Sequence, residues 1–322
     1  MGSMNFFLPA VFFVAGFFLM TFGANHLVRA GSAIAAYFRI SPLIIGLTIV
    51  SFGTSFPEFA ASFMGALHGR TDISLGNVVG SNICNLGLVL GAAAITRPIR
   101  VQSGLIRREI PFVLAVSILT WIMVSNGVIQ RLEGLMLAAL FCLFLWYCIA
   151  WAKREAGISD GMPAVAVMSA AQNTMRLVLG LGALFAGAEL VIRSAVAMAE
   201  RFQISEAVIG LTLVAFGTSL PELVTSVVAM KNGEGDIGLG NILGSNIFNL
   251  LFVLGVTAAV RPVTASPLFF RTDIPVMLAL TVLLLPMART QLRISRREGL
   301  FLLSSYGAYL LYLIIARPST LG

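Results

Sequence analysis

The sequence has few charged residues, and this shortage excludes a soluble globular domain. Only 11% of the 322 residues are charged and 58% are hydrophobic, whereas a soluble domain carries about 25% charged residues. The net charge of +7 comes from basic residues in short loops between apolar segments. This placement indicates membrane topology and not nucleic-acid binding.

Residues that commonly carry catalysis or hold metal ions are also scarce. The two histidines, His26 and His68, have no metal-type neighbour one helical turn away, and the three cysteines lie in apolar segments without metal-type spacing. The sequence lacks an HExxH pair, a Ser/His or Ser/Lys nucleophile arrangement, and paired aspartates at membrane depth. We therefore expect no enzymatic activity, no cofactor and no disulfide framework.

Long apolar runs occupy most of the chain. Because about 20 apolar residues cross a hydrocarbon layer of ~30 Å, the runs between charged or turn-rich breaks predict an all-α integral membrane protein with ten transmembrane helices. The predicted spans are residues 6–30, 42–67, 74–95, 105–125, 132–151, 173–199, 206–230, 238–260, 268–288 and 297–316.

An internal repeat divides the chain into two halves at an offset of 164 residues. Residues 46–58 match residues 210–222 at 10 of 13 positions, and residues 76–91 match residues 240–255 at 11 of 16. An odd number of spans per repeat places the halves in opposite orientations across the membrane. The sequence thus predicts two inverted five-helix repeats in 1–151 and 173–322, joined by a cytoplasmic linker in 152–172.

Loop charges assign a direction to this topology. With both termini outside, 14 of the 21 Lys and Arg residues fall on the cytoplasmic side and seven fall outside. Because cytoplasmic loops are enriched in Lys and Arg, both termini are predicted to lie outside.

The most specific motif, Gly-Thr-Ser-x-Pro-Glu, occurs at 53–58 and again at 217–222. Each copy places a carboxylate in an apolar span, which costs roughly 2.5–3.5 kcal/mol at the bilayer centre and marks a functional site. The prolines lack an N–H and free backbone carbonyls one turn earlier. The residues on each glutamate face are Glu58, Ser55, Thr54 and Ser51 in the first copy, and Glu222, Ser219, Thr218 and Ala215 in the second.

The next span of each repeat adds a second polar stripe at i, i+4 and i+8. The stripes are Asn77, Ser81 and Asn85 in the first repeat, and Asn241, Ser245 and Asn249 in the second. Two carboxylates with many neutral oxygens form the ligand set that Ca²⁺ prefers and that Na⁺ accepts. The interiors of these four spans contain no basic residue, so a cation site is favoured over a structural ion pair. Glu189, by contrast, precedes Arg193 by four residues and predicts such a pair.

These paired motifs, with Gly-Asn-x-x-Gly-Ser-Asn-Ile-x-Asn at 76–85 and 240–249, resemble the calcium/cation antiporter superfamily, specifically small prokaryotic members of its sodium/calcium exchanger branch. The resemblance covers nearly the whole chain. It implies a ten-helix fold whose repeats form an ion-binding core, while the first and sixth helices slide or tilt. It also implies an integral inner-membrane protein of a prokaryote.

The resemblance assigns calcium coordination to Glu58, Glu222 and the carbonyls of Thr54 and Thr218. It assigns sodium binding to Ser55, Ser81, Ser219, Ser245, the carbonyls near Ser51 and Ala215, and both glutamates, with Asn85 and Asn249 lining the centre. Some relatives carry Asp where this chain has Asn249, so the resemblance does not fix the number of exchanged ions.

The function expected from these features is secondary active exchange of Na⁺ for Ca²⁺ by alternating access. A proton-coupled or K⁺-dependent calcium antiporter is the alternative in the same class, and a cation channel is the alternative in another. The expected partners are Ca²⁺ and Na⁺ as substrates and membrane lipid, with no nucleic acid, and the protein is expected to act as a monomer.

Overall fold

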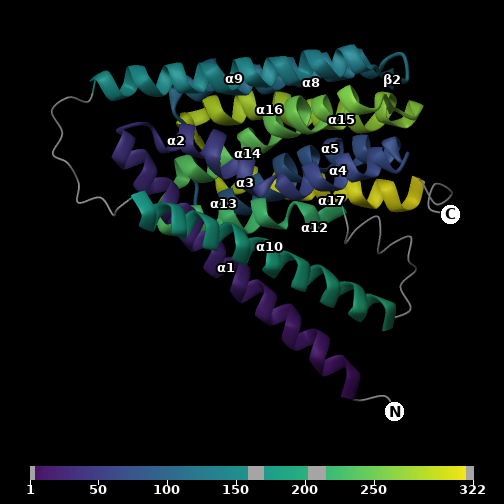
Figure 1. The fold of residues 1–322 in the computed structure, drawn as a ribbon, viewed down its shortest axis with the longest axis horizontal. Helices are drawn as coiled ribbons and strands as arrows, with labels where there is room; N and C mark the ends of the chain where they lie inside the picture. The colour runs from purple at the N-terminus through teal and green to yellow at the C-terminus, as the bar shows by residue number, and fades with distance from the viewer. Residues whose placement is uncertain (1–3, 159–169, 202–214, 317–322) are drawn as a thin grey trace.

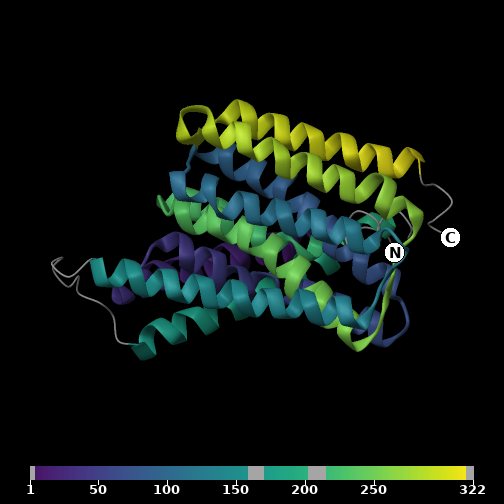
Figure 2. The ribbon, with the colours of Figure 1, turned by 90° about the horizontal axis from the view of Figure 1, so that it is seen from above.

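The computed structural model describes residues 4–158, 170–201 and 215–316, and within these ranges the chain is almost entirely helical (Figure 1). Long helices lie side by side, and α1 crosses the others obliquely. Figure 2 shows the same helices from above, with the C-terminal helix at one edge of the stack. The only strands in the described ranges are four segments of two residues each.

The elements of the first repeat are α1 (Met4–Phe38), α2 (Pro42–Ile45), the π-helix η1 (Gly46–Val50), α3 (Ser51–Thr54), α4 (Phe56–Leu67), α5 (Thr71–Cys84), the π-helix η2 (Asn85–Val89), α6 (Leu90–Thr96), β1 (Ile99–Arg100), α7 (Ser103–Arg107), α8 (Glu109–Val124), β2 (Val128–Ile129) and α9 (Arg131–Ile158).

The elements of the second repeat are α10 (Ala170–Arg201), α12 (Ala215–Thr218), α13 (Leu220–Asn232), α14 (Gly235–Ile247), the π-helix η4 (Phe248–Val253), α15 (Leu254–Val260), β3 (Val263–Thr264), the π-helix η5 (Phe269–Asp273), α16 (Ile274–Arg289), the 3₁₀-helix η6 (Thr290–Leu292), β4 (Arg293–Ile294) and α17 (Arg296–Ala316).

Eight of the ten predicted spans have a counterpart that is long and apolar enough to cross a membrane. Seven are continuous helices, and the eighth is the bent pair formed by Pro42–Thr54 and Phe56–Leu67. The predicted fourth span corresponds to α8, a helix of 16 residues, which is short for a crossing. Residues 206–214 of the predicted seventh span lie outside the described residues.

The predicted linker 152–172 is shorter in the structure than in the sequence analysis. The helix α9 continues to Ile158 and α10 already begins at Ala170. The first two turns of the predicted linker therefore extend α9, and residues 159–169 lie outside the described residues.

Helices α1 and α10 occupy equivalent positions in the two repeats and pack against each other in opposite directions. A Cβ on Gly23 would lie 2.6 Å from the Gly180 carbonyl oxygen, and one on Gly187 would lie 2.7 Å from the Gly16 carbonyl oxygen. The earlier glycine of each helix thus faces the later glycine of the other, which defines an antiparallel crossing. Small residues allow this close backbone approach.

The short strands connect the two repeats at two places. The strand β1 pairs with β4, and β2 pairs with β3, in both cases antiparallel. The strands β1 and β3 follow equivalent helices in the two repeats, as do β2 and β4. Each pair therefore joins one repeat to the other, and the two pairs are equivalent under the internal symmetry.

The helices that carry the second polar stripe form the centre of the molecule. In the 18-residue apolar windows of the spans Ile73–Thr96 and Gly235–Val260, 78% and 83% of residues are buried, against 33% or less in the corresponding windows of the other continuous spans. The outer helices expose apolar side chains such as Phe18 and Trp146, as expected for surfaces that face lipid. The polar stripe that both repeats carry on these central helices is thus enclosed by protein.

Candidate ion-binding site

Both Gly-Thr-Ser-x-Pro-Glu motifs interrupt a helix. The helices α3 and α4 meet at Ser55 with a bend of 46°, and Pro57 lies in the first turn of α4. In the second repeat α12 ends at Thr218, and α13 begins at Leu220 with Pro221 in its first turn. Proline cannot donate to the preceding turn, which accounts for both interruptions.

The two interruptions bring the glutamates of the two repeats together. The Ser55 hydroxyl donates to Glu222 Oε1 over 2.8 Å, and the Ser219 hydroxyl donates to Glu58 Oε1 over 3.3 Å. The Ser245 hydroxyl also donates to Glu222 Oε1, over 3.4 Å. Both glutamates are 0% exposed. Each carboxylate is thus held by a serine of the opposite repeat.

Two asparagines of the second polar stripe, Asn77 and Asn241, fix the helix breaks from the other repeat. Asn241 Oδ1 accepts from the Thr54 hydroxyl over 2.9 Å, and Asn77 Oδ1 accepts from the Thr218 hydroxyl over 3.4 Å. Their Nδ2 groups donate to the carbonyls of the glutamates in their own repeat, Glu58 at 3.1 Å and Glu222 at 3.5 Å. These bonds connect the polar stripes to the backbone of the motifs.

Several oxygens in this region are buried without a hydrogen-bond partner. They are Glu58 Oε2, Glu222 Oε2, Ser81 Oγ, Asn85 Oδ1 and Asn249 Oδ1. No Lys, Arg or His in the described ranges forms an ion pair with either glutamate. Buried oxygens without partners are costly unless a cation or donor satisfies them. Carboxylate, hydroxyl and amide oxygens in one cluster fit a hard cation such as Ca²⁺ or Na⁺.

The predicted site residues whose side chains are described lie in this region. Ser51 differs from the other serines in the partner of its hydroxyl. The Ser51 hydroxyl donates back to the Leu47 carbonyl over 2.8 Å, so it serves its own helix. The Ser51 carbonyl accepts from Ser55 N and from the Thr54 hydroxyl. Ala215 is the first residue of α12, and its side chain lies outside the described residues. Whether these residues bind ions stays a prediction.

Sequence reasoning missed Asn82 and Asn246, which form hydrogen bonds between the repeats. Asn85 Nδ2 donates to Asn246 Oδ1, and Asn249 Nδ2 donates to Asn82 Oδ1, both over 3.1 Å. Both asparagines follow the serine of the second stripe and fall off the i, i+4, i+8 pattern. Their presence in both motif copies was the signal that could have identified them.

The helix geometry changes where the second polar stripe ends. A π-helix begins at Asn85 in the first repeat and at Phe248, one residue before Asn249, in the second. Such π-bulges occur frequently at functional sites because they redirect side chains within a helix. The terminal asparagines of both stripes thus lie at the start of a local widening.

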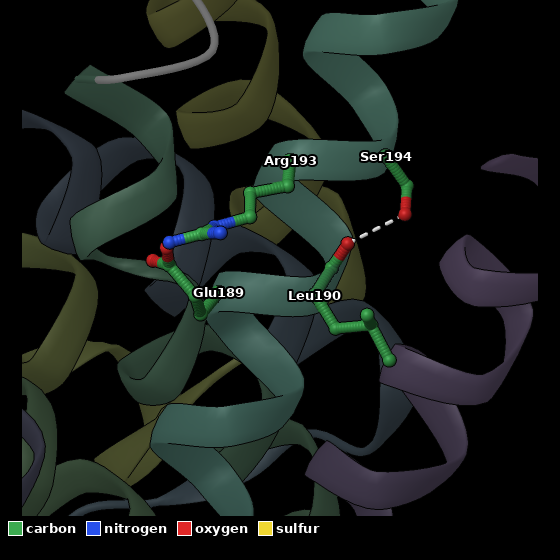
Figure 3. A network of polar contacts seen from close by, with 4 residues as sticks. All are labelled: Glu189, Leu190, Arg193 and Ser194. Carbon is green, nitrogen blue, oxygen red and sulfur yellow. Dashed lines mark hydrogen bonds and ion pairs between the residues drawn. The ribbon is translucent and has the colours of Figure 1, made fainter.

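The predicted ion pair between Glu189 and Arg193 is confirmed and lies outside this site. Figure 3 shows the Arg193 guanidinium against the Glu189 carboxylate on α10, one turn apart. The same view shows the Ser194 hydroxyl donating to the Leu190 carbonyl. Both charged side chains are largely exposed in the structure, so Glu189 differs in environment from the two buried glutamates.

The long apolar helices define a multi-span membrane protein. Two symmetry-related helices, each interrupted beside a buried carboxylate, form its candidate cation site. The family model for sodium/calcium exchanger protein matches residues 8–150 and 173–315. The chain therefore belongs to the sodium/calcium exchanger family, whose members are antiporters.

Relatives along nearly the full length agree with this assignment. The chain is 40% identical to the putative antiporter CaxA of Alkalimonas amylolytica over 94% of this chain and 97% of the relative. It is 37% identical to the inner membrane protein YrbG of Escherichia coli, over 86% and 87%. It is 31% identical to the sodium/calcium exchanger MaX1 of Methanosarcina acetivorans, over 92% and 96%.

A solved structure also matches the fold. The sodium–calcium exchanger NCX_Mj, soaked with Na⁺ and Ca²⁺, superimposes with a TM-score of 0.82 at 32% identity. The match covers 96% of this chain and 99% of that chain. The resemblance inferred from the motifs is thus confirmed at the level of the family, and the all-helical fold matches that of a membrane exchanger.

Proposed function

We propose that this protein is a secondary active antiporter that exchanges Na⁺ for Ca²⁺ across the membrane. The observation that carries the proposal is the pair of fully buried carboxylates, Glu58 and Glu222, each held by a serine of the opposite repeat and each retaining one oxygen without a partner. The names of NCX_Mj and MaX1 support Na⁺ and Ca²⁺ as the substrates.

Charge balance provides the mechanism. Two ionised carboxylates in a site that excludes water are costly unless a cation neutralises them. One Ca²⁺ or two Na⁺ ions supply the same compensating charge, so the two loads exclude each other. The empty site keeps its uncompensated carboxylates and cannot pass apolar barriers cheaply, which prevents leak. Because Ca²⁺ and Na⁺ cannot occupy the site together, and because the empty site rarely changes the side to which it opens, transport of one ion requires transport of the other in the opposite direction.

Two inverted five-helix repeats complete the proposed architecture. The antiparallel packing of α1 with α10 and the cross-repeat strand pairs support this inversion. Inverted repeats suit alternating access, because each repeat can take the conformation of the other and open the same site to the opposite side. A channel would require an open path and more commonly uses rings formed by oligomers.

One asymmetry between the repeats supports alternating access in particular. The helix α1 packs along α13, but the equivalent pair, α10 and α4, lacks comparable packing within the described parts of both helices. The Ser32 hydroxyl donates to Glu234 Oε1 over 2.7 Å, and Asn232 Nδ2 donates to Asn25 Oδ1 over 3.0 Å. By loop charge we assign the α13–α14 turn to the cytoplasm, so this arrangement corresponds to a state closed toward the cytoplasm.

Crosslinking of α1 to the α13–α14 turn is expected to arrest transport. The repeat offset maps Ser32 and Glu234 onto Val196 and Arg70, which would approach each other in the opposite state. In a background with the exposed Cys142 replaced by serine, a short thiol-reactive bis-methanethiosulfonate crosslinker, cleavable by a reductant, is applied to the pair Ser32→Cys with Glu234→Cys. It is applied separately to the pair Val196→Cys with Arg70→Cys. Each link should stop exchange, and cleavage should restore it.

The single-cysteine variants treated with the same reagent serve as controls. Exchange that continues at the untreated rate after complete linking of the Ser32 and Glu234 positions would contradict the alternating movement of α1.

Reconstituted transport tests the proposed function directly. Proteoliposomes loaded with Na⁺ and diluted into Na⁺-free buffer should accumulate radioactive Ca²⁺, because the outward Na⁺ gradient drives the antiport. Parallel vesicles carry equal Na⁺ on both sides, a pH gradient, or added K⁺. Uptake driven only by the pH gradient would establish proton coupling instead, and a requirement for K⁺ would establish the K⁺-dependent alternative. Discrete single-channel currents in planar bilayers would indicate a channel.

A further inference from the structure

The amides of Asn85 and Asn249 each have one end bonded across the repeats and one end without a partner. The bonded end is Nδ2, which donates to Asn246 Oδ1 from Asn85 and to Asn82 Oδ1 from Asn249, both over 3.1 Å. The other end is Oδ1, which is buried without a hydrogen-bond partner in both residues. All four asparagines are at most 1% exposed.

The bonds fix the orientation of each amide. An amide carries a donor and an acceptor on opposite sides of one rotatable bond. Because the donor of Asn85 is held by Asn246, its oxygen remains on the side of the amide away from Asn246. Asn85 lies one turn after Ser81, on the helix face that carries the second polar stripe. A half-turn would break the bond and present the N–H₂ group, whose partial positive charge repels a cation. The same reasoning applies to Asn249 with Asn82.

We infer that Asn82 and Asn246 are positioning residues, each of which orients the amide oxygen of the opposite repeat's terminal asparagine toward the transported cation. The inference rests on the proposed ion site at Glu58 and Glu222. Asn82 and Asn246 contact Asn249 and Asn85, respectively, and act on the ion only through them. Outer partners that orient a ligand typically change cation affinity by about 10–100-fold when they are removed.

The two positioning residues differ in how firmly they are held. Asn82 Nδ2 donates to the Asn246 carbonyl over 3.2 Å, whereas Asn246 Nδ2 has no partner. Asn246 therefore contributes only its acceptor in this structure, and an isosteric aspartate would retain that acceptor. The substitutions Asn246→Leu and Asn246→Asp thus separate the loss of the acceptor from the loss of the amide.

A double-mutant cycle tests the inference on the purified full-length protein. The readout is the apparent dissociation constant for Ca²⁺ and for Na⁺, each titrated alone and followed by thermal stabilisation. The cycle uses the cation whose affinity falls most in Asn85→Ala. Asn246→Leu should weaken that cation roughly tenfold. In the Asn85→Ala background it should have no further effect, because no amide remains to orient.

Asn249→Ala provides the matched control, because the Asn246 side chain accepts its hydrogen bond from Asn85, whereas Asn249 donates to Asn82. Asn246→Leu should weaken binding by the same factor in the Asn249→Ala background as in the wild type. Asn246→Asp should bind at least as tightly as the wild type, which provides a second variant if the leucine variant does not fold.

Additive losses for Asn246→Leu and Asn85→Ala would overturn the inference, as would a loss of affinity in Asn246→Asp. An Asn85→Ala variant with unchanged affinity for both cations would also overturn it. A wild-type protein that neither Ca²⁺ nor Na⁺ stabilises would instead refute the proposed ion site itself, so the two failures are distinguishable.

Discussion

Glu58→Gln and Glu222→Gln are each expected to reduce Na⁺-driven Ca²⁺ uptake to the level of protein-free vesicles. Each change removes one charge from a fully buried pair whose only described partners are hydroxyl groups. Loss of one member of a buried charge interaction costs about 3–5 kcal/mol, which is a factor of at least one hundred in affinity. The measurement is the initial rate of radioactive Ca²⁺ uptake at matched protein content.

Glu189→Gln is the matched control for this experiment. Glu189 also lies on a membrane-spanning helix, but its partner is Arg193 on the same exposed helix face. Exposed ion pairs contribute about 0–1 kcal/mol, so this variant should transport at close to the wild-type rate. Wild-type uptake in both buried-glutamate variants would remove these carboxylates from the mechanism.

The glycine contacts between α1 and α10 predict the second large effect. In Gly23→Ala, the new methyl group would lie 2.6 Å from the Gly180 carbonyl oxygen and 2.7 Å from Leu184 N. Both contacts are backbone atoms, so they cannot be relieved by rotation of a side chain. Overpacking of this kind costs about 1–3 kcal/mol. The variant should show a lower melting temperature in detergent and slower exchange, because α1 and α10 cannot retain their crossing.

Gly182→Ala on α10 is the control, since a Cβ there would meet nothing within 4 Å. Alanine favours helix over glycine by about 1 kcal/mol, so this variant should melt at or above the wild-type temperature. Equal melting temperatures and exchange rates for Gly23→Ala and Gly182→Ala would show that the crossing does not depend on close backbone approach.

The membrane class, the repeat and the candidate site residues could be predicted from the sequence because each is visible in short stretches of residues. A buried carboxylate such as Glu58 is conspicuous in an apolar span, and its repetition at Glu222 with the same flanking residues excludes coincidence. The ends of the helices were predicted less accurately. The helix α9 extends through Lys153 and Arg154 to Ile158, because these residues favour helix as strongly as they signal the end of an apolar run.

Contacts between the repeats could not be derived from the sequence. Periodicity places Ser55 on the same helical face as Glu58, but the hydroxyl of Ser55 bonds to Glu222 in the other repeat. The pairing of Asn85 with Asn246 is of the same kind. Helical periodicity fixes which residues share a face, and it carries no information about which face of a distant helix lies opposite.

The sequence by itself determined that this chain spans a membrane, that its halves are related, and that each half contributes one carboxylate with neutral oxygens. These properties depend on hydropathy and on local spacing along single helices. Only the tertiary structure decided that the serine of one repeat holds the glutamate of the other, and that α1 packs along α13 whereas the described parts of α10 and α4 lack comparable packing. The physical reason is that two related halves encode the same set of contacts, whereas the packing of the whole chain selects which of them form together.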